Sequence, residues 1–149
     1  MKRLKEKIKE HFQEVLKIKK SPKSIAIGFT IGTFFGIAPT FGVEAILIIL
    51  IILIFKKVSK LALLAAYVIW NPIVTIPLYA LGYKIGDFLL KSPIKYYKVE
   101  YLGEIFFYSK RVILGTAILA ILISIISYLI VLHFTEKYQR KLEKDLIGV

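Results

Sequence analysis

The sequence predicts an all-α integral membrane protein, on three observations. The chain has 149 residues, enough for a single domain. Its hydrophobic fraction is 57% and its mean hydropathy +0.69, whereas soluble domains are about 45–50% apolar. The 22 Lys and Arg against ten Asp and Glu are segregated: residues 1–24 hold nine basic side chains, whereas residues 112–134 hold no Asp, Glu, Lys or Arg. This pattern disfavours a soluble enzyme, a disordered polycation and a nucleic-acid-binding domain.

The N-terminal segment, residues 1–20, predicts a basic amphipathic interfacial helix. Its apolar residues fall on one side of a 3.6-residue wheel, and lysines cover most of the rest. Such a helix suits the anionic headgroups of membrane lipids, although a solvated basic tail is the alternative. The charged segment is too long for the n-region of a cleavable signal peptide. Cysteine is absent, which excludes disulfides and thiolate chemistry.

Residues 25–55 form a first apolar block that is interrupted at Pro39 and Gly42. As one straight helix the block would be about 46 Å long, against a hydrocarbon core of about 30 Å. Neither arm is long enough to span the core alone. The block is therefore either a re-entrant hairpin or a kinked, tilted span.

Residues 61–90 form a second apolar block with breaks at Asn71-Pro72 and at Thr75-Ile76-Pro77. We expect its second arm to resume at Leu78. An interfacial aromatic and basic segment follows over residues 91–111. Residues 112–134 predict the one continuous transmembrane helix, about 35 Å long, and residues 135–149 a polar tail.

Loop charges favour two re-entrant hairpins followed by one span. Lys and Arg concentrate in cytoplasmic loops, and residues 56–60 carry three basic residues and no acid. A hairpin in the first block keeps this loop on the side of the basic N-terminus. We expect a multi-pass protein of the bacterial or archaeal inner membrane, with its N-terminus cytoplasmic and its C-terminus outside.

Two stripes of glycine predict close helix contacts. Glycines spaced by four share one helix face and allow two backbones to approach in lipid. The stripes would join the two blocks, or copies of the chain in a homo-oligomer. They are Gly28, Gly32 and Gly36 in the first block and Gly82 and Gly86 in the second.

The two breaks predict a polar site. Irregular backbone at membrane depth is tolerated where protein buries it or water lines it, and paired broken segments point to a transporter-like site. We expect the half-helices after Pro39 and Pro72 to converge there with their positive ends. Thr40, Asn71, Thr75 and Tyr79 would bind the ligand. The alternative is that these side chains cap their own helices.

Glu44 is the strongest single candidate for a functional residue, because placing a carboxyl group within an apolar membrane segment has a high free-energy cost. It would hold a proton, a cation or a partner amine, or else pair with a lysine at the interface. Lys84 would contact a lipid headgroup together with Tyr83, or pair with Asp87 three residues away.

Signatures of catalysis are thin. His11 and His133 lie at opposite ends of the chain, and no cluster has the spacing of metal ligands. Neither a Ser/His/Asp order nor a phosphate-binding Gly-Lys-Ser/Thr loop occurs. We therefore expect no catalytic residue, no metal site, no cofactor and no nucleic-acid partner.

Both apolar blocks contain a recurring set of Gly, Pro and polar residues. These are Ser21-Pro22-Lys23-Ser24-Ile25-Ala26-Ile27-Gly28-Phe29, Gly32, Gly36, Pro39, Phe41, Gly42, Trp70-Asn71-Pro72, Thr75, Pro77-Leu78-Tyr79, Gly82 and Gly86. With these residues, the stretch from Ser21 through Gly86, a little under half of the chain, resembles the bacterial membrane family called domain of unknown function 2062. Some relatives carry a glycosyltransferase-like domain, so the resemblance implies a link to lipid-linked glycan or envelope metabolism.

Taken together, these features predict a small transporter- or channel-like protein. Its site would lie between the breaks and suit an ion or a phosphate-bearing lipid or solute. The alternative is a non-catalytic scaffold or anchor that recruits an envelope enzyme.

Overall fold

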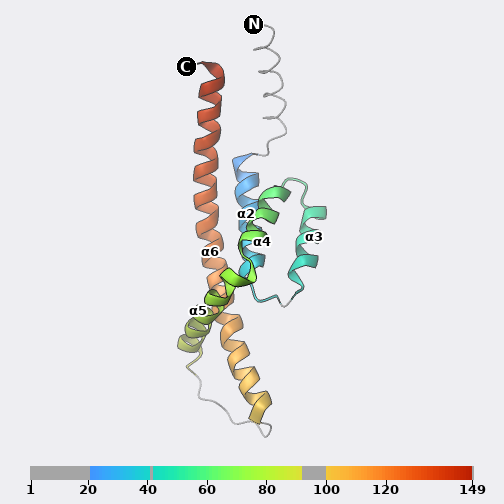
Figure 1. Cartoon of the computed structure of the whole chain (residues 1–149), viewed down its shortest axis with the longest axis vertical. Coiled ribbons are helices and arrows are strands. Elements are labelled where there is room, and N and C mark those ends of the chain that lie inside the picture. Colours follow the sequence, from blue (N-terminus) through green and yellow to red (C-terminus); the bar gives the residue numbers. More distant parts are fainter. Residues whose placement is uncertain (1–20, 41, 92–99, 149) are drawn as a thin grey trace.

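The computed structural model describes residues 21–40, 42–91 and 100–148, and this part of the chain contains helices and no strand. The all-helical prediction is therefore confirmed for these residues, while the basic helix expected over residues 1–20 lies outside them. The helices are α2 (Pro22–Ile37), α3 (Glu44–Ile54), α4 (Lys60–Ile69), α5 (Pro72–Leu90) and α6 (Glu100–Ile147) (Figure 1).

The first apolar block folds back on itself. Ser21 caps α2 by accepting a hydrogen bond from the Ser24 amide at 3.3 Å, and Pro22 occupies the first turn. α2 ends at Ile37, two residues before Pro39, and α3 then runs back beside it (Figure 1). Ile48 is the buried residue of α3, and side chains of α2 and α4 pack around it.

α4 lies parallel to α2, and the first glycine stripe makes the contact. A Cβ on Gly28 would collide with the Ser59 carbonyl, one on Gly32 with the Leu63 carbonyl, and one on Gly36 with the Cβ of Trp70 at 2.7 Å. The contacts advance along both helices in the same direction. The first block therefore packs on the second through this stripe.

Polar contacts fasten the same pair of helices at both ends. Near the start of α2, the Ser59 amide donates to the Ser24 carbonyl at 3.2 Å, and the Ser24 hydroxyl donates to the Lys57 carbonyl. Near its end, the Trp70 indole N–H donates to the Thr33 hydroxyl at 3.1 Å. These bonds fix the register of α2 against α4.

The second apolar block does not fold back. α4 packs on α2, whereas α5 leaves it at a bend and packs on α6 (Figure 1). The arrangement is a kinked rod, which corrects the preference for a second hairpin. The break expected at Thr75-Ile76-Pro77 is also absent, because α5 runs through Pro77 from Pro72 onward. Pro77 deprives one carbonyl, that of Ile73, of its helical donor, and that loss does not end the helix.

α6 is a single helix of 48 residues, about 72 Å long at 1.5 Å per residue. It takes in part of the predicted aromatic segment, the predicted span and most of the predicted tail. It runs antiparallel to α5, where Gly82 lies against Thr116 and Gly86 against Arg111, with Gly115 opposite both glycines. It also runs antiparallel to α2, where Ile37 packs with Ala120. The second glycine stripe thus holds α5 on α6.

Within the described residues, two helices are long and apolar enough to cross a membrane, namely α5 and the Tyr108–Ile147 part of α6. Their most apolar windows are only 17% buried within the chain. Large apolar side chains lie at the surface, with Leu61 81% exposed and Ile73 82% exposed. Contiguous apolar surface of this kind is typical of contact with lipid or with a partner.

Candidate functional site

The two helix breaks meet at one cavity of about 500 Å³. Its walls come from the end of α2, the start of α3, the end of α4 and the start of α5, with Val112 of α6 at one side. The cavity therefore gathers segments that lie more than thirty residues apart in the sequence. Five of the six predicted ligand residues line it: Thr40, Glu44, Asn71, Thr75 and Tyr79.

Glu44 lies in the first turn of α3, and groups of the chain itself hold its carboxylate. One oxygen, Oε2, accepts from the Thr40 hydroxyl at 2.8 Å and from the Gly42 amide at 2.7 Å. The Tyr67 hydroxyl of α4 lies near the carboxylate. The contacts with Thr40 and Gly42 fix the carboxylate over the connection before α3, at the positive end of that helix, where a negative charge is favourable. The lysine partner considered from the sequence is not among them.

Asn71 and Thr75 perform local capping in addition to lining the cavity. The Asn71 carboxamide oxygen accepts from the amides of Ile73 at 3.0 Å and Val74 at 3.2 Å, which makes it the N-cap of α5. The Thr75 hydroxyl donates to the carbonyls of Asn71 and Pro72, each at 3.3 Å. The positive end of α5 is therefore largely satisfied by its own residues.

The negative ends of α2 and α4 also open at this cavity, which the sequence analysis did not consider. Residue 39 is a proline, so it has no N–H to give to the Phe35 carbonyl, and the Thr40 amide donates to Ala38 rather than to Gly36. The signal was in the sequence, since a proline always deprives the carbonyl four residues earlier.

The second break repeats this loss. Pro72 has no N–H to give to the Val68 carbonyl, and the Ile73 amide donates to the Asn71 side chain rather than to the Ile69 carbonyl. Phe35 and Val68, the residues that the two prolines deprive, both line the cavity. Two helix C-termini with under-used carbonyls therefore face one space.

Four aromatic side chains complete the lining: Phe35, Tyr67, Trp70 and Tyr79. Of these four residues, Tyr79 alone was predicted from the sequence to bind the ligand. Trp70 is the one tryptophan of the chain, and its bond to the buried Thr33 hydroxyl orients the indole at the end of α4. Phe35, Tyr67 and Tyr79 come from α2, α4 and α5. No spacing within one segment of the sequence could therefore have grouped these three rings.

Lys84 lies away from the cavity, exposed on α5. The pairing that the sequence suggested with Asp87 gives way to a different ion pair. Asp87 accepts from Arg111 Nε of α6 at 2.6 Å, with the Arg111 side chain 4% exposed and that of Asp87 53% exposed. Tyr83 stacks near Tyr108 with ring centroids 5.7 Å apart. This cluster joins α5 to α6 at the far end from the loop between α3 and α4.

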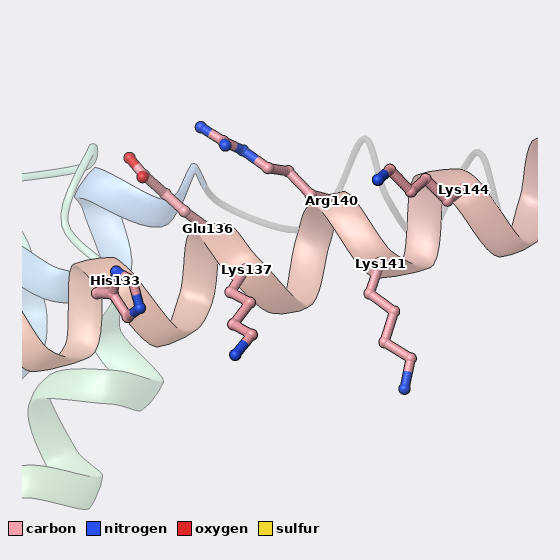
Figure 2. A pocket seen from close by; sticks show the side chains of 6 residues that line it. All are labelled: His133, Glu136, Lys137, Arg140, Lys141 and Lys144. Atoms are coloured by element: carbon pink, nitrogen blue, oxygen red, sulfur yellow. The ribbon is translucent and has the colours of Figure 1, made fainter.

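A second cluster is basic and belongs to α6 alone. Figure 2 shows side chains leaving the helix on different sides, with Glu136 and Arg140 directed one way and Lys137 and Lys141 another. The residues are His133, Glu136, Lys137, Arg140, Lys141 and Lys144. These six residues include four Lys or Arg and one carboxylate, and Glu143 and Asp145 lie on the same exposed stretch of helix.

Comparison with known proteins gives one match. The model of the family DUF2062, described as an uncharacterized protein conserved in bacteria, matches residues 5–144. No curated protein and no solved structure matches the chain. The match takes in both apolar blocks, the cavity and nearly all of α6, well beyond the stretch that carried the resemblance. The chain therefore belongs to the DUF2062 family.

Proposed function

We propose that this chain is a small transporter- or channel-like protein of the cytoplasmic membrane, and that its site is the cavity between the two breaks. One observation carries the proposal: two proline-broken apolar segments bring their interrupted ends to a common cavity that contains a carboxylate. Broken helices that meet around a polar cavity are the usual construction of transporter sites.

The depth of the cavity supports this proposal. α6 has an uncharged run over residues 112–134, bounded by Arg111 and Glu136. The end of α2 packs on Ala120, which lies about 12 Å inside the run at 1.5 Å per residue. If the run crosses the bilayer, the end of α2 lies within the hydrocarbon region, and the cavity extends from there toward Val112, the first residue of the run. A carboxylate within the hydrocarbon region has a high free-energy cost and by default indicates a functional site.

The arrangement also supports a topology of two crossings and one re-entrant hairpin. α2 and α3 would enter and leave on one side, α4 and α5 would cross as one kinked span, and α6 would return. The C-terminus then shares the side of the α3–α4 loop, contrary to the placement outside made from loop charges. Of the twelve described Lys and Arg, eight lie at this end and four toward the other, which fits a cytoplasmic assignment for the first. The eight are Lys23, Lys56, Lys57, Lys60, Lys137, Arg140, Lys141 and Lys144, and the four are Lys84, Lys91, Lys110 and Arg111.

Purified protein in proteoliposomes tests the proposal. With an imposed ion gradient and a potential-sensitive dye, we expect the wild-type chain to dissipate the potential and Glu44→Gln to reduce the rate about tenfold or more. The matched control is Glu143→Gln, on the exposed C-terminal part of α6. If neither flux nor thermal stabilisation occurs with simple cations, phosphate or polyprenyl phosphates, the proposal is wrong.

The second candidate is a membrane scaffold, and the basic surface of α6 favours it. The residues from Glu136 to Ile147 extend the helix by about 18 Å beyond its uncharged run, with the cationic side chains of Figure 2. A photo-crosslinker in place of Lys144 distinguishes the two functions. Recovery of one envelope enzyme, together with no flux, would support the scaffold over the transporter.

A further inference from the structure

We infer that the cavity takes a monovalent organic cation, an ammonium group carried on a small solute. This inference rests on the proposed function and names the class of ligand for the same site. It differs from the expectation of a phosphate-bearing ligand, because charge, exposed carbonyls and aromatic lining all favour a cation.

The charge of the cavity is negative. Among the described residues that line it, Glu44 is the one with a charged side chain. Lys84 lies elsewhere on α5, and the buried cation Arg111 is engaged with Asp87. A phosphate would therefore meet a carboxylate with no basic side chain of the lining to offset it, which is strongly unfavourable away from water.

The partial charges of the helix ends also favour a positively charged ligand. The positive end of α3 already carries the negative Glu44 carboxylate in its first turn, and the positive end of α5 is capped by the Asn71 side chain. The ends with spare capacity are the C-termini of α2 and α4, where Pro39 and Pro72 deprive the carbonyls of Phe35 and Val68 of donors. Helix C-termini carry partial negative charge and stabilise cations, and an ammonium N–H can donate to carbonyls of this kind.

The size and lining favour an organic ion over a bare metal ion. A cavity of about 500 Å³ matches sites for small molecules, which are about 300–1,000 Å³. The rings of Phe35, Tyr67, Trp70 and Tyr79 offer π-faces for the quadrupole attraction that binds ammonium groups. No group of three or more metal-ligating side chains occurs in the described part of the chain. One carboxylate balances one positive charge, so the cation is monovalent.

Trp70 allows a direct test, because the only tryptophan of the protein lies in the cavity wall. The full chain in lipid nanodiscs is titrated at constant ionic strength with tetramethylammonium, butylammonium, sodium and phosphate, and Trp70 emission is recorded. We expect saturable changes in emission with the two ammonium ions. Their apparent affinity should be at least tenfold lower in Glu44→Gln and unchanged in the control Glu143→Gln.

A second variant keeps the inference testable if Glu44→Gln does not fold. Tyr79→Leu removes one ring from the lining and should lower the affinity for tetramethylammonium about fivefold. The melting temperature of the variant without ligand should stay within a few degrees of that of the wild type. Unchanged affinity in a folded Tyr79→Leu overturns the inference.

The remaining outcomes separate this inference from the proposed function. A response to phosphate, or to sodium at least as strong as to the ammonium ions, overturns the ammonium assignment and leaves a ligand site in place. No response to any probe, together with no flux in proteoliposomes, overturns both.

Discussion

The contact between α2 and α4 through Gly32 gives a prediction with a calculable magnitude. In Gly32→Ala the new Cβ would lie 2.9 Å from the Ala66 Cβ and 3.0 Å from the Leu63 carbonyl carbon, and closer still to the Leu63 oxygen. Carbon atoms in contact are about 3.5–4.0 Å apart, so the two helices must separate. Backbone on the opposing helix cannot rotate away as a flexible side chain can.

Two terms of opposite sign set the size of the effect. Forced overpacking costs about 1–3 kcal/mol, whereas replacing glycine with alanine favours the helix by about 0.8–1.0 kcal/mol. The difference between the two terms spans about 0–2 kcal/mol. Because the nearest opposed atoms belong to the Leu63 backbone, we expect the upper part of this range, a decrease of about 1–2 kcal/mol in the free energy of unfolding of Gly32→Ala. Gly32→Leu should lower it further.

Unfolding by sodium dodecyl sulfate in mixed micelles measures this change. Trp70 emission is the reporter, since Trp70 packs on Gly36 one turn further along the same contact. Ala65→Leu is the matched control, because Ala65 is exposed on α4 and added bulk there should change the stability by less than about 0.5 kcal/mol. A Gly32→Ala protein as stable as the wild type, or more so, would refute the close-contact argument.

Three further predictions concern other contacts. Asp87→Asn should lower the free energy of unfolding by about 1–2 kcal/mol, between the values for exposed and buried ion pairs, because Arg111 is buried while Asp87 is half exposed. Lys84→Gln should leave the free energy of unfolding unchanged. Equal stabilities of the two variants would contradict the ion pair. Thr33→Val should lower the free energy of unfolding by about 1–3 kcal/mol and shift Trp70 emission, because the indole N–H loses its acceptor. A Thr33→Val variant with wild-type stability and emission would argue against that bond. In this cysteine-free chain, Lys57→Cys and Gly148→Cys should react with an impermeant thiol reagent from the same side of the membrane and Lys91→Cys from the other. Labelling of all three from one side would contradict the kinked span.

Much of the fold could be predicted from the sequence because lipid makes its requirements local. A proline in an apolar run removes a donor wherever it stands, so the breaks near Pro39 and Pro72 were visible. Glycines spaced by four share a helix face, so Gly28, Gly32 and Gly36 were recognised as a contact surface. Pro77 was wrongly taken as a break, because the same local rule does not show that a helix can continue after losing one hydrogen bond.

The partners across helices could not be predicted in the same way. Asp87 and Lys84 are neighbours on one helix, and only the packing of α5 on α6 brings Arg111 closer to the carboxylate. Gly82 and Gly86 were expected to join the blocks to each other, yet they meet α6. Whether the second block folds back or continues as a kinked rod depends on which helix α5 packs against. The loop charges that favoured a hairpin from the sequence carry no information on this packing.

The same limit applies to the candidate site. Thr40, Glu44, Asn71 and Thr75 were predicted from the breaks next to them, and the structure brings them to one cavity. Tyr67 lies within a regular helix with no break beside it, and its approach to Glu44 depends on how α3 folds back over α4. The position of Tyr67 beside the carboxylate therefore had no signal in the sequence.

The slight attachment of α3 has a consequence for how the cavity could open. Gly28 and Gly32 bring the backbone of α2 against that of α4, and Gly36 packs on the Trp70 side chain, so these two helices are closely joined. α3 is secured mainly through Ile48 and its neighbours, and Gly42, with φ of +90°, stands in the short connection before it. A rotation at that connection would swing α3 outward and carry Glu44 away from Tyr67, which would expose the carboxylate while the rest of the wall stays in place.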